Sequence, residues 1–331
     1  MTGAPTDPSD AYRSLAESVA HDDPRWAFGT DLAGTDLAGT GLAGTDPAGA
    51  RLAGTGTGTG LEDLATEITA PVPDGVDAGD LAQYCLMLGD DALILAQRLA
   101  EWITNAPELE EEVAFGNTAL DLLGQARVLL ARAGRVNGAG QDEDALAYLR
   151  PEAEFRNVAL AELPDDLDFA RAVARLLIFS TWRLAVLHRL LGSRDPLVAA
   201  VAGKGVKEVA YHRDHAARWV LRLGDGTAES HRRMQAALEA VWPHADELFR
   251  TSEVERRLVA AGVAVDPAET RDEVDDVLEQ VLAAATLTRP HVRPAGPNGG
   301  RAGRQGLHTE HLGPLLAVLQ SLAREHPGAT W

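Results

Sequence analysis

Apolar residues recur three and four positions apart over most of the chain, which is the spacing of helices that bury one face. Runs of β-branched residues are short, and no long segment alternates apolar and polar positions as a half-buried strand would. The pattern therefore predicts an all-α fold. It places four long helices at residues 79–105, 107–134, 168–191 and 195–223.

Shorter helices are predicted around these four, at residues 142–149, 152–162, 228–249, 267–287 and 309–325. The long helices form two pairs, each joined by a short turn, and a longer connection separates the pairs. This order is typical of a four-helix bundle with one crossover. We expect the remaining C-terminal helices to pack outside the bundle.

The N-terminal part of the chain has a different composition. Residues 31–60 repeat a five-residue unit such as DLAGT, whose single leucine recurs too rarely to build the face of a helix or a strand. Such a segment buries too little apolar surface to offset the entropy of ordering it. We expect residues 1–60 to be a disordered extension and residues 61–331 to form the helical domain.

The charge balance narrows the classes of partner. Fifty acidic residues against 30 basic ones give a formal net charge of −20, which disfavours binding to nucleic acid. The single cysteine, Cys85, excludes an internal disulfide framework. No signal-peptide pattern or membrane-length apolar run is found. We expect a cytoplasmic protein that binds no membrane.

Metal chemistry is the first function to consider for a helical bundle. A di-iron site in such a bundle takes one glutamate from each of two helices and a Glu-x-x-His pair from each of the other two. This chain contains no Glu-x-x-His pair. On the inward face of the second long helix stand Leu122 and Gln125; leucine cannot bind a metal, and an amide is a poor substitute for imidazole. We expect a filled site in which Gln125 is a polar remnant or a core amide.

Two histidine clusters remain as candidates. Glu208, His212 and His215 form one stripe on the fourth long helix and could hold a metal, although a carboxylate and an imidazole four residues apart also pair without any ion. We favour the second interpretation. A further cluster, for which helix-start packing or a subunit contact is favoured over metal binding, comprises His308, Glu310 and His311.

A glycine-rich and proline-rich loop at residues 289–306 precedes the second cluster and carries a local basic patch. Guanidinium groups suit both phosphates and carboxylates, so the loop could contact a phosphate or an acidic partner surface. The alternative is a solvated connector. Its arginines are Arg289, Arg293, Arg301 and Arg304.

Several collinear stretches between residues 80 and 331 resemble the C subunits of bacterial phenylacetyl-CoA ring epoxidases, also called phenylacetate-CoA oxygenases. The resemblance implies a ferritin-like subunit that has lost its di-iron site, has a structural role and pairs with a related catalytic A subunit that keeps the iron. The stretches are LGDDALILAQRLAEW, APELEEEVAFGNTALDLLGQARVLL, DEDALAYLR, EFRNVALAELP, KEVAYH, LRLGDGTAESHRRMQAAL, AATLTRP and LHTEHLGPLLAVLQSL.

The same resemblance assigns positions to the lost site. Leu122 and Gln125 fall where the catalytic relative has its glutamate and histidine on one helix, and Val209 and His212 fall at the corresponding pair on another. Glu101 is expected to be a further remnant near the inward face of the first long helix. The resemblance thus implies no cofactor in this chain and a di-iron centre in its partner.

Two other hypotheses stay open at this stage. The chain could be a metal-dependent oxygenase or hydrolase with a nonstandard ligand set: Glu208 and His212 with Glu101, Asp121 and Gln125. Separately, Arg301 and Arg304 could contact the phosphates of coenzyme A or an acidic partner surface. Other subunits of the complex and a homo-oligomer are further expected partners.

Overall fold

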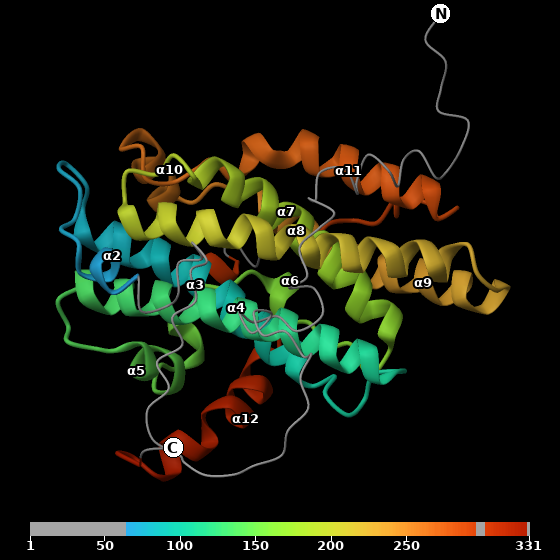
Figure 1. Cartoon of the computed structure of the whole chain (residues 1–331), viewed down its shortest axis with the longest axis horizontal. Helices are drawn as coiled ribbons and strands as arrows, with labels where there is room; N and C mark the ends of the chain where they lie inside the picture. The colour runs from blue at the N-terminus through green and yellow to red at the C-terminus, as the bar shows by residue number, and fades with distance from the viewer. Residues whose placement is uncertain (1–63, 296–301, 330–331) are drawn as a thin grey trace, which may run out of the picture.

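The computed structural model describes residues 64–295 and 302–329, and within these ranges all regular secondary structure is helical (Figure 1). The expected all-α class is confirmed. The α-helices are α2 (Ala65–Thr69), α3 (Ala78–Ala100), α4 (Leu109–Val136), α5 (Glu143–Tyr148), α6 (Ala159–Glu162), α7 (Phe169–Leu190), α8 (Pro196–Gly224), α9 (Ala228–Val241), α10 (Glu253–Ala260), α11 (Arg271–Ala284) and α12 (Leu312–Glu325). The short 3-10 helices are η3 (Glu152–Glu154), η4 (Trp242–Phe249), η5 (Pro267–Thr270) and η6 (Gly303–Gln305).

The long helices pack as two pairs, α3 against α4 and α7 against α8, and the pairs meet chiefly through α4 and α8 (Figure 1). Local sequence fixes where they begin. The side chain of Asp195 accepts a hydrogen bond from the backbone N–H of Val198 and so caps α8. Its other carboxylate oxygen accepts from Arg132 of α4 at 2.6 Å, and both side chains are fully buried. The start of α8 is thereby fixed to α4.

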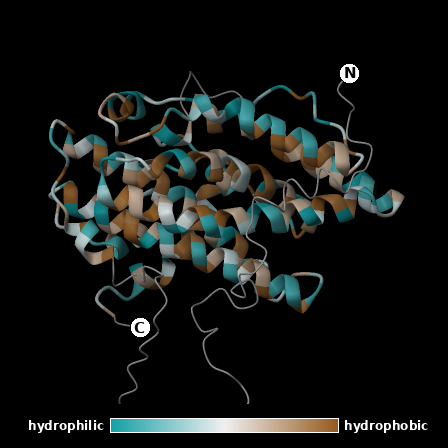
Figure 2. Cartoon of the chain, turned by 45° about the horizontal axis from the view of Figure 1, so that its top comes forward, coloured by the Kyte–Doolittle hydropathy of each residue, from teal (hydrophilic) through white to brown (hydrophobic). Residues whose placement is uncertain are grey.

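An aromatic cluster joins the two helix pairs at one end. Trp102 follows α3, Phe115 lies on α4, and Phe169 begins α7; the ring centroids of Trp102 lie 5.9 Å from Phe115 and 5.7 Å from Phe169. Trp219 of α8 packs edge-on against Phe169 at 4.9 Å. Elsewhere the core consists mainly of leucine, alanine and valine, and hydrophobic residues concentrate on the faces that the helices turn to one another (Figure 2).

The later helices cover the outside of the long ones, as expected. Helices α9 and α11 pack on α7 and α8, whereas α12 packs against α5 and η3 on the opposite side (Figure 1). In the described ranges no helix combines the length and the apolar character that a bilayer span requires. The expected disordered extension, residues 1–60, lies outside the described residues.

Two of the shorter predicted helices are interrupted in the structure. The segment expected to be helical at 152–162 is broken between η3 and α6, because the backbone N–H groups of Arg156 and Val158 donate to the side chains of Asp90 and Asp91 instead of to helical carbonyls. The helix expected at 228–249 changes to a 3-10 helix at Trp242, where Pro243 removes a backbone donor.

The other corrections concern helix ends in the C-terminal part. Helix α10 was not predicted, although Ser252 and Glu255 form a capping box at its start. The helix expected at 267–287 begins as the 3-10 turn η5 before α11. The last helix begins at Leu312 rather than at 309.

Candidate functional site

Polar side chains join α4 and α8 at three levels along their contact. The amide Nε2 of Gln125 donates to Glu208 Oε2 at 2.9 Å, and His212 Nε2 lies 3.0 Å from Asp121 Oδ2. Farther along, His215 Nε2 lies 3.1 Å from the carboxylate of Glu111. The predicted stripe on α8 therefore exists, but each of its members faces its own partner on α4 rather than a common centre.

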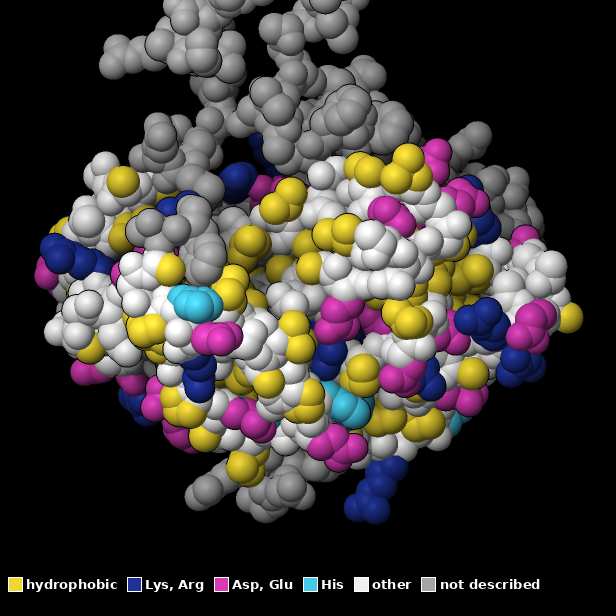
Figure 3. Space-filling model, turned by 90° about the horizontal axis from the view of Figure 1, so that it is seen from below, with side chains coloured by type: hydrophobic (Ala, Val, Ile, Leu, Met, Phe, Trp, Pro, Cys, Tyr) yellow, Lys and Arg dark blue, Asp and Glu magenta, His cyan; other side chains and the backbone are white. Residues whose placement is uncertain are grey.

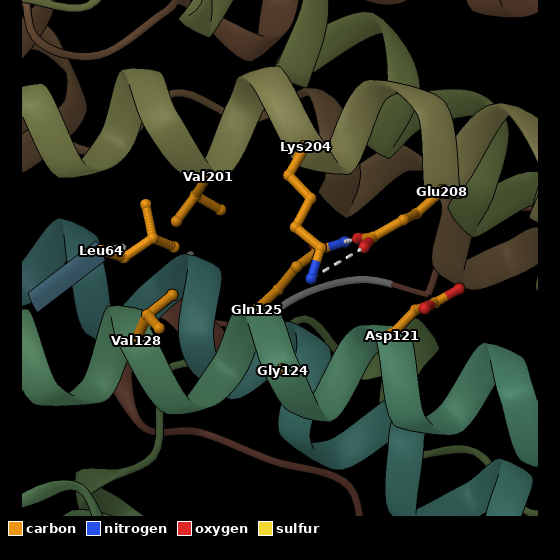
Figure 4. Close-up of a pocket in the computed structure, with 8 residues that line it drawn as sticks. All are labelled: Leu64, Asp121, Gly124, Gln125, Val128, Val201, Lys204 and Glu208. Carbon is orange, nitrogen blue, oxygen red and sulfur yellow. Dashed lines mark hydrogen bonds and ion pairs between the residues drawn. The ribbon is translucent and has the colours of Figure 1, made fainter. Parts of the chain in front are cut away.

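The carboxyl group of Glu208 is easier to protonate in the protein than it would be in water. Its side chain is 14% exposed, and its nearest cation, Lys204 Nζ, lies 3.5 Å from Oε1. Burial raises the pKa of Glu208, and the nearby charge of Asp121 raises it further. Figure 4 shows these side chains around a crevice between α4 and α8. The crevice has a volume of about 10 Å³, room for about one water molecule.

A buried guanidinium from α7 completes this group. Arg183 is 1% exposed, and its Nη2 and Nε donate to Gln125 Oε1 at 2.9 and 3.1 Å. The same guanidinium lies 3.3 and 3.4 Å from the backbone oxygen of Leu88 on α3. Burial lowers the pKa of Arg183 to about 10, so the group stays charged at neutral pH. We call the chain of contacts through Arg183, Gln125 and Glu208 the Arg183 cluster; its arginine was not predicted from the sequence.

A second buried cluster lies on α3. Asp90 and Asp91 are both fully buried, and each receives a guanidinium fork from a distant segment. Arg150 donates through both terminal nitrogens to Asp90. Arg304 donates to the two oxygens of Asp91 at 3.0 and 2.8 Å. Burial raises the pKa of Asp91, and the charge of Arg304 opposes that shift. We call Asp90 and Asp91 the α3 carboxylates.

The four positions at which the resemblance predicts remnants of a di-iron site are all inside the protein. Leu122, Val209 and His212 are each 1% exposed, and Gln125 is 4% exposed. Glu101 does not join them, which corrects the expectation that it lies near the inward face. Helix α3 ends at Ala100, so Glu101 is its half-exposed C-cap and pairs with Arg98 at 2.8 Å. The alternative ligand set therefore loses one of its carboxylates.

The residues that remain do not gather as a metal-binding group. Within residues 64–295 and 302–329, no three histidine, cysteine or carboxylate side chains come together in a way that could hold an ion. Cys85, the lone thiol, is fully buried in the core, and burial raises its pKa. It is thus packed as a core residue.

One arginine of the predicted basic loop, Arg304, is engaged inside the protein. Arg304 is 7% exposed and is held by Asp91 and by the backbone oxygens of Met87 and Arg156. It is therefore not available to a phosphate or a partner surface, and that expectation is corrected. Of the other arginines in the loop, Arg289 pairs with Asp275 at 2.9 Å, Arg293 is exposed, and Arg301 lies outside the described residues.

The histidine cluster before α12 also separates into individual contacts. His308 Nδ1 lies 2.9 Å from Glu162 Oε2, and its Nε2 lies 3.1 Å from the backbone oxygen of Phe155. Burial alone would lower the pKa of His308, but the hydrogen bond and the charge of Glu162, together with the hydrogen bond to the Phe155 carbonyl, outweigh burial and raise that pKa. Glu310 is exposed, and His311 is half-buried with its backbone oxygen accepting from Arg98. A partner contact by Glu310 or His311 stays a prediction.

Comparison with known proteins places the chain in a family. The family model described as phenylacetic acid catabolic protein matches residues 71–331. The chain belongs to this family. A curated member from Escherichia coli strain K12, the C subunit of 1,2-phenylacetyl-CoA epoxidase, is 43% identical over 251 residues, which cover 76% of this chain and 99% of the relative. The match to the family begins close to where the described helices begin.

Proposed function

We propose that this chain is a non-catalytic, structural subunit of a multicomponent phenylacetyl-CoA epoxidase, in which it stabilises a di-iron catalytic A subunit. Its four long helices would form a ferritin-like four-helix bundle. Family membership and the identity to a relative named as the C subunit of such an epoxidase support the complex and the substrate. A coenzyme A thioester is a cytoplasmic metabolite, and we expect the complex there.

The side chains packed between the long helices support the proposal that this chain is not catalytic. The residues there do not fit a di-iron centre, because Leu122 and Val209 offer no ligand atom and Gln125 is engaged by Arg183 and Glu208. A buried guanidinium also opposes the binding of cations nearby, since like charges repel strongly where water is excluded. Only His212 keeps a residue type suited to iron at the four carried-over positions.

The same interior gives this chain a stability that needs no metal. Arg183 satisfies the amide of Gln125, which in turn donates to Glu208, so the polar groups find partners within the chain. Leu122, buried where a ligand is predicted in the catalytic relative, contributes about 2 kcal/mol of hydrophobic stabilisation. Such a chain can act as a preformed scaffold on which a metal-binding relative folds and docks.

Reconstitution tests the proposal. The catalytic A subunit and the reductase of the same organism are purified, and ring epoxidation of phenylacetyl-CoA is measured with and without this chain. We expect soluble, active A subunit only when this chain is present, and no activity from this chain with the reductase alone. A catalytic subunit that is fully active and equally stable by itself would contradict the scaffold role.

A further inference from the structure

An apolar stripe runs along the outer face of α4. Four large hydrophobic side chains there are solvent-exposed: Leu109 by 70%, Val113 by 45%, Leu120 by 59% and Leu123 by 44%. Together with Gly116 they follow one another at steps of four, three, four and three residues. We call these five residues the α4 stripe. Single exposed leucines are common on protein surfaces, but a contiguous row along one helix marks an interaction site.

The spacing of the α4 stripe specifies what fits it. Steps of three and four residues are those of a helix–helix seam, in which side chains of one helix insert between those of another. Gly116 lies in the middle of the stripe, and a Cβ added there would meet no atom within 4 Å. Gly124, just beyond Leu123, is equally open, so a second helix can approach the backbone of α4 closely. The face therefore suits another amphipathic helix.

The charges beside the stripe restrict that helix further. Glu110 lies on one side of the stripe and Glu112 on the other, within the acidic first turn of α4. At the far end Arg127 is engaged by Glu143 at 3.2 Å. A second copy of this chain would place the same acidic borders and a net charge of −20 against the stripe, so repulsion disfavours it as the occupant. The N-terminal repeat at residues 31–60 is also disfavoured as the occupant. Its leucines recur at multiples of five positions, which does not match a helix–helix seam with steps of three and four residues.

We propose that the α4 stripe is a docking surface for an amphipathic helix of another subunit, with apolar residues at steps of three and four and with lysine or arginine on both flanks. This inference rests on the proposed function, under which the helix belongs to the catalytic A subunit. The stripe borders the crevice that Asp121 and Gly124 line, so docking would cover the Asp121–His212 contact. The acidic borders would steer and orient the partner.

Binding of the purified A subunit to the full chain tests the stripe. The variant Leu120→Glu with Leu123→Glu places two charges in the stripe. The matched control is Val318→Glu with Leu322→Glu on α12, where the two side chains are 71% and 51% exposed. Helix α12 lies on the face seen in Figure 3, where hydrophobic, acidic and basic side chains are intermixed. We expect the α4 variant to bind about 100-fold more weakly, and the α12 control to bind within about 3-fold of wild type.

A second pair of variants tests the charge of the partner helix. Glu110→Lys with Glu112→Lys reverses the borders of the stripe, and Asp272→Lys with Glu273→Lys makes the same change in the first turn of α11. Both pairs lose acidic residues from a helix start and so carry a similar cost to the helix itself. We expect the α4 pair to slow association about 10-fold at low salt, with the difference shrinking as salt is added.

Four results would overturn the inference. The α4 variant could bind the A subunit as tightly as wild type does. The wild-type chain could form a dimer that is lost in the α4 variant but kept in the α12 control, while the α4 variant binds the A subunit with unchanged affinity. A second copy of the chain would then cover the stripe. The thermal midpoint of the isolated α4 variant could fall sharply with affinity unchanged, so that the chain covers its own stripe. Finally, a wild-type chain that does not bind the A subunit at all would refute the proposed function and the stripe together.

Discussion

Two polar clusters lie among the long helices: the carboxylates of one are fully buried, and those of the other are partly exposed. Asp90 and Asp91 are completely buried, and each faces a guanidinium fork. Asp121 and Glu208, in the contact between α4 and α8, are 21% and 14% exposed. Their partners are an imidazole, an amide and a surface lysine. Each carboxylate of the first cluster contacts a guanidinium directly, whereas Glu208 is separated from the guanidinium of Arg183 by the amide of Gln125.

The fully buried cluster holds distant parts of the chain together. Arg304 lies 213 residues after Asp91, so their contact anchors the segment before α12 to the middle of α3. The contact between α4 and α8 includes the positions predicted to be remnants of a di-iron site, and there the buried guanidinium of Arg183 donates to Gln125. Disturbing a paired buried carboxylate costs much stability, whereas disturbing a partly exposed one costs little.

The largest effect is expected at the α3 carboxylates. Arg304→Met leaves Asp91 buried without its counter-charge, which costs about 3 to 5 kcal/mol in the free energy of unfolding. Denaturant unfolding measures the change. Arg232→Met is the matched control, because Arg232 is 68% exposed in a surface pair with Glu229 and its loss should leave stability nearly unchanged. Equal effects at the two arginines would remove the contrast between the clusters.

A smaller loss is expected at the Arg183 cluster. Arg183→Met removes the donors to Gln125 Oε1 and to the Leu88 carbonyl, and leaves these acceptors in the core. We expect about 2 to 4 kcal/mol of destabilisation by the same measurement. A change below about 1 kcal/mol would mean that the guanidinium is not the interior's main polar support.

Glu208→Gln should act in the opposite direction. The pKa of Glu208 is raised in the fold, so its ionised form is penalised, and stability is lost as pH rises through that folded pKa. Removing the charge should therefore stabilise the chain at pH 7 by on the order of 1 kcal/mol, and the gain should vanish below the ordinary glutamate pKa of about 4.3. Thermal midpoints of both proteins across this pH range measure it. A loss of stability at pH 7 would show that Glu208 acts as a needed counter-charge.

The smallest effect concerns His308. Its folded pKa is raised, so its contribution is complete below the unfolded pKa of about 6.5 and is lost as pH rises through the folded value. The stability advantage of wild type over His308→Gln should therefore be larger at pH 5.5 than at pH 8.5. If the difference between the two proteins is the same at both pH values, the Glu162–His308 contact does not depend on the imidazolium.

The sequence was enough to predict the long helices, because apolar periodicity and end signals such as the Asp195–Pro196 cap are local. The burial of Leu122 and Gln125 also followed from helical spacing. The role of Arg183 could not be predicted, because it depends on the register between α4 and α7, which no local pattern encodes. One signal was present: a lone arginine in the apolar run LLIFSTWRLAVL.

The predictions for Arg304 and Glu101 were wrong for related reasons. Glycine and proline around Arg304 are typical of an exposed loop, yet the guanidinium of Arg304 reaches Asp91, a contact set by tertiary structure. Glu101 continues the helical spacing of α3, but the helix ends one residue earlier at Ala100. Helix ends are where periodicity is least informative, since only caps and tertiary contacts define them.

The metal content of the purified chain, measured after ferrous iron has been offered to it, tests most directly whether the interior is that of a non-catalytic subunit. We predict iron, manganese and zinc well below one ion per chain, with the same result for His212→Ala. About two ions per chain, lost on His212→Ala, would contradict this and make the chain a metal-dependent oxygenase or hydrolase that uses Glu208, His212 and Asp121.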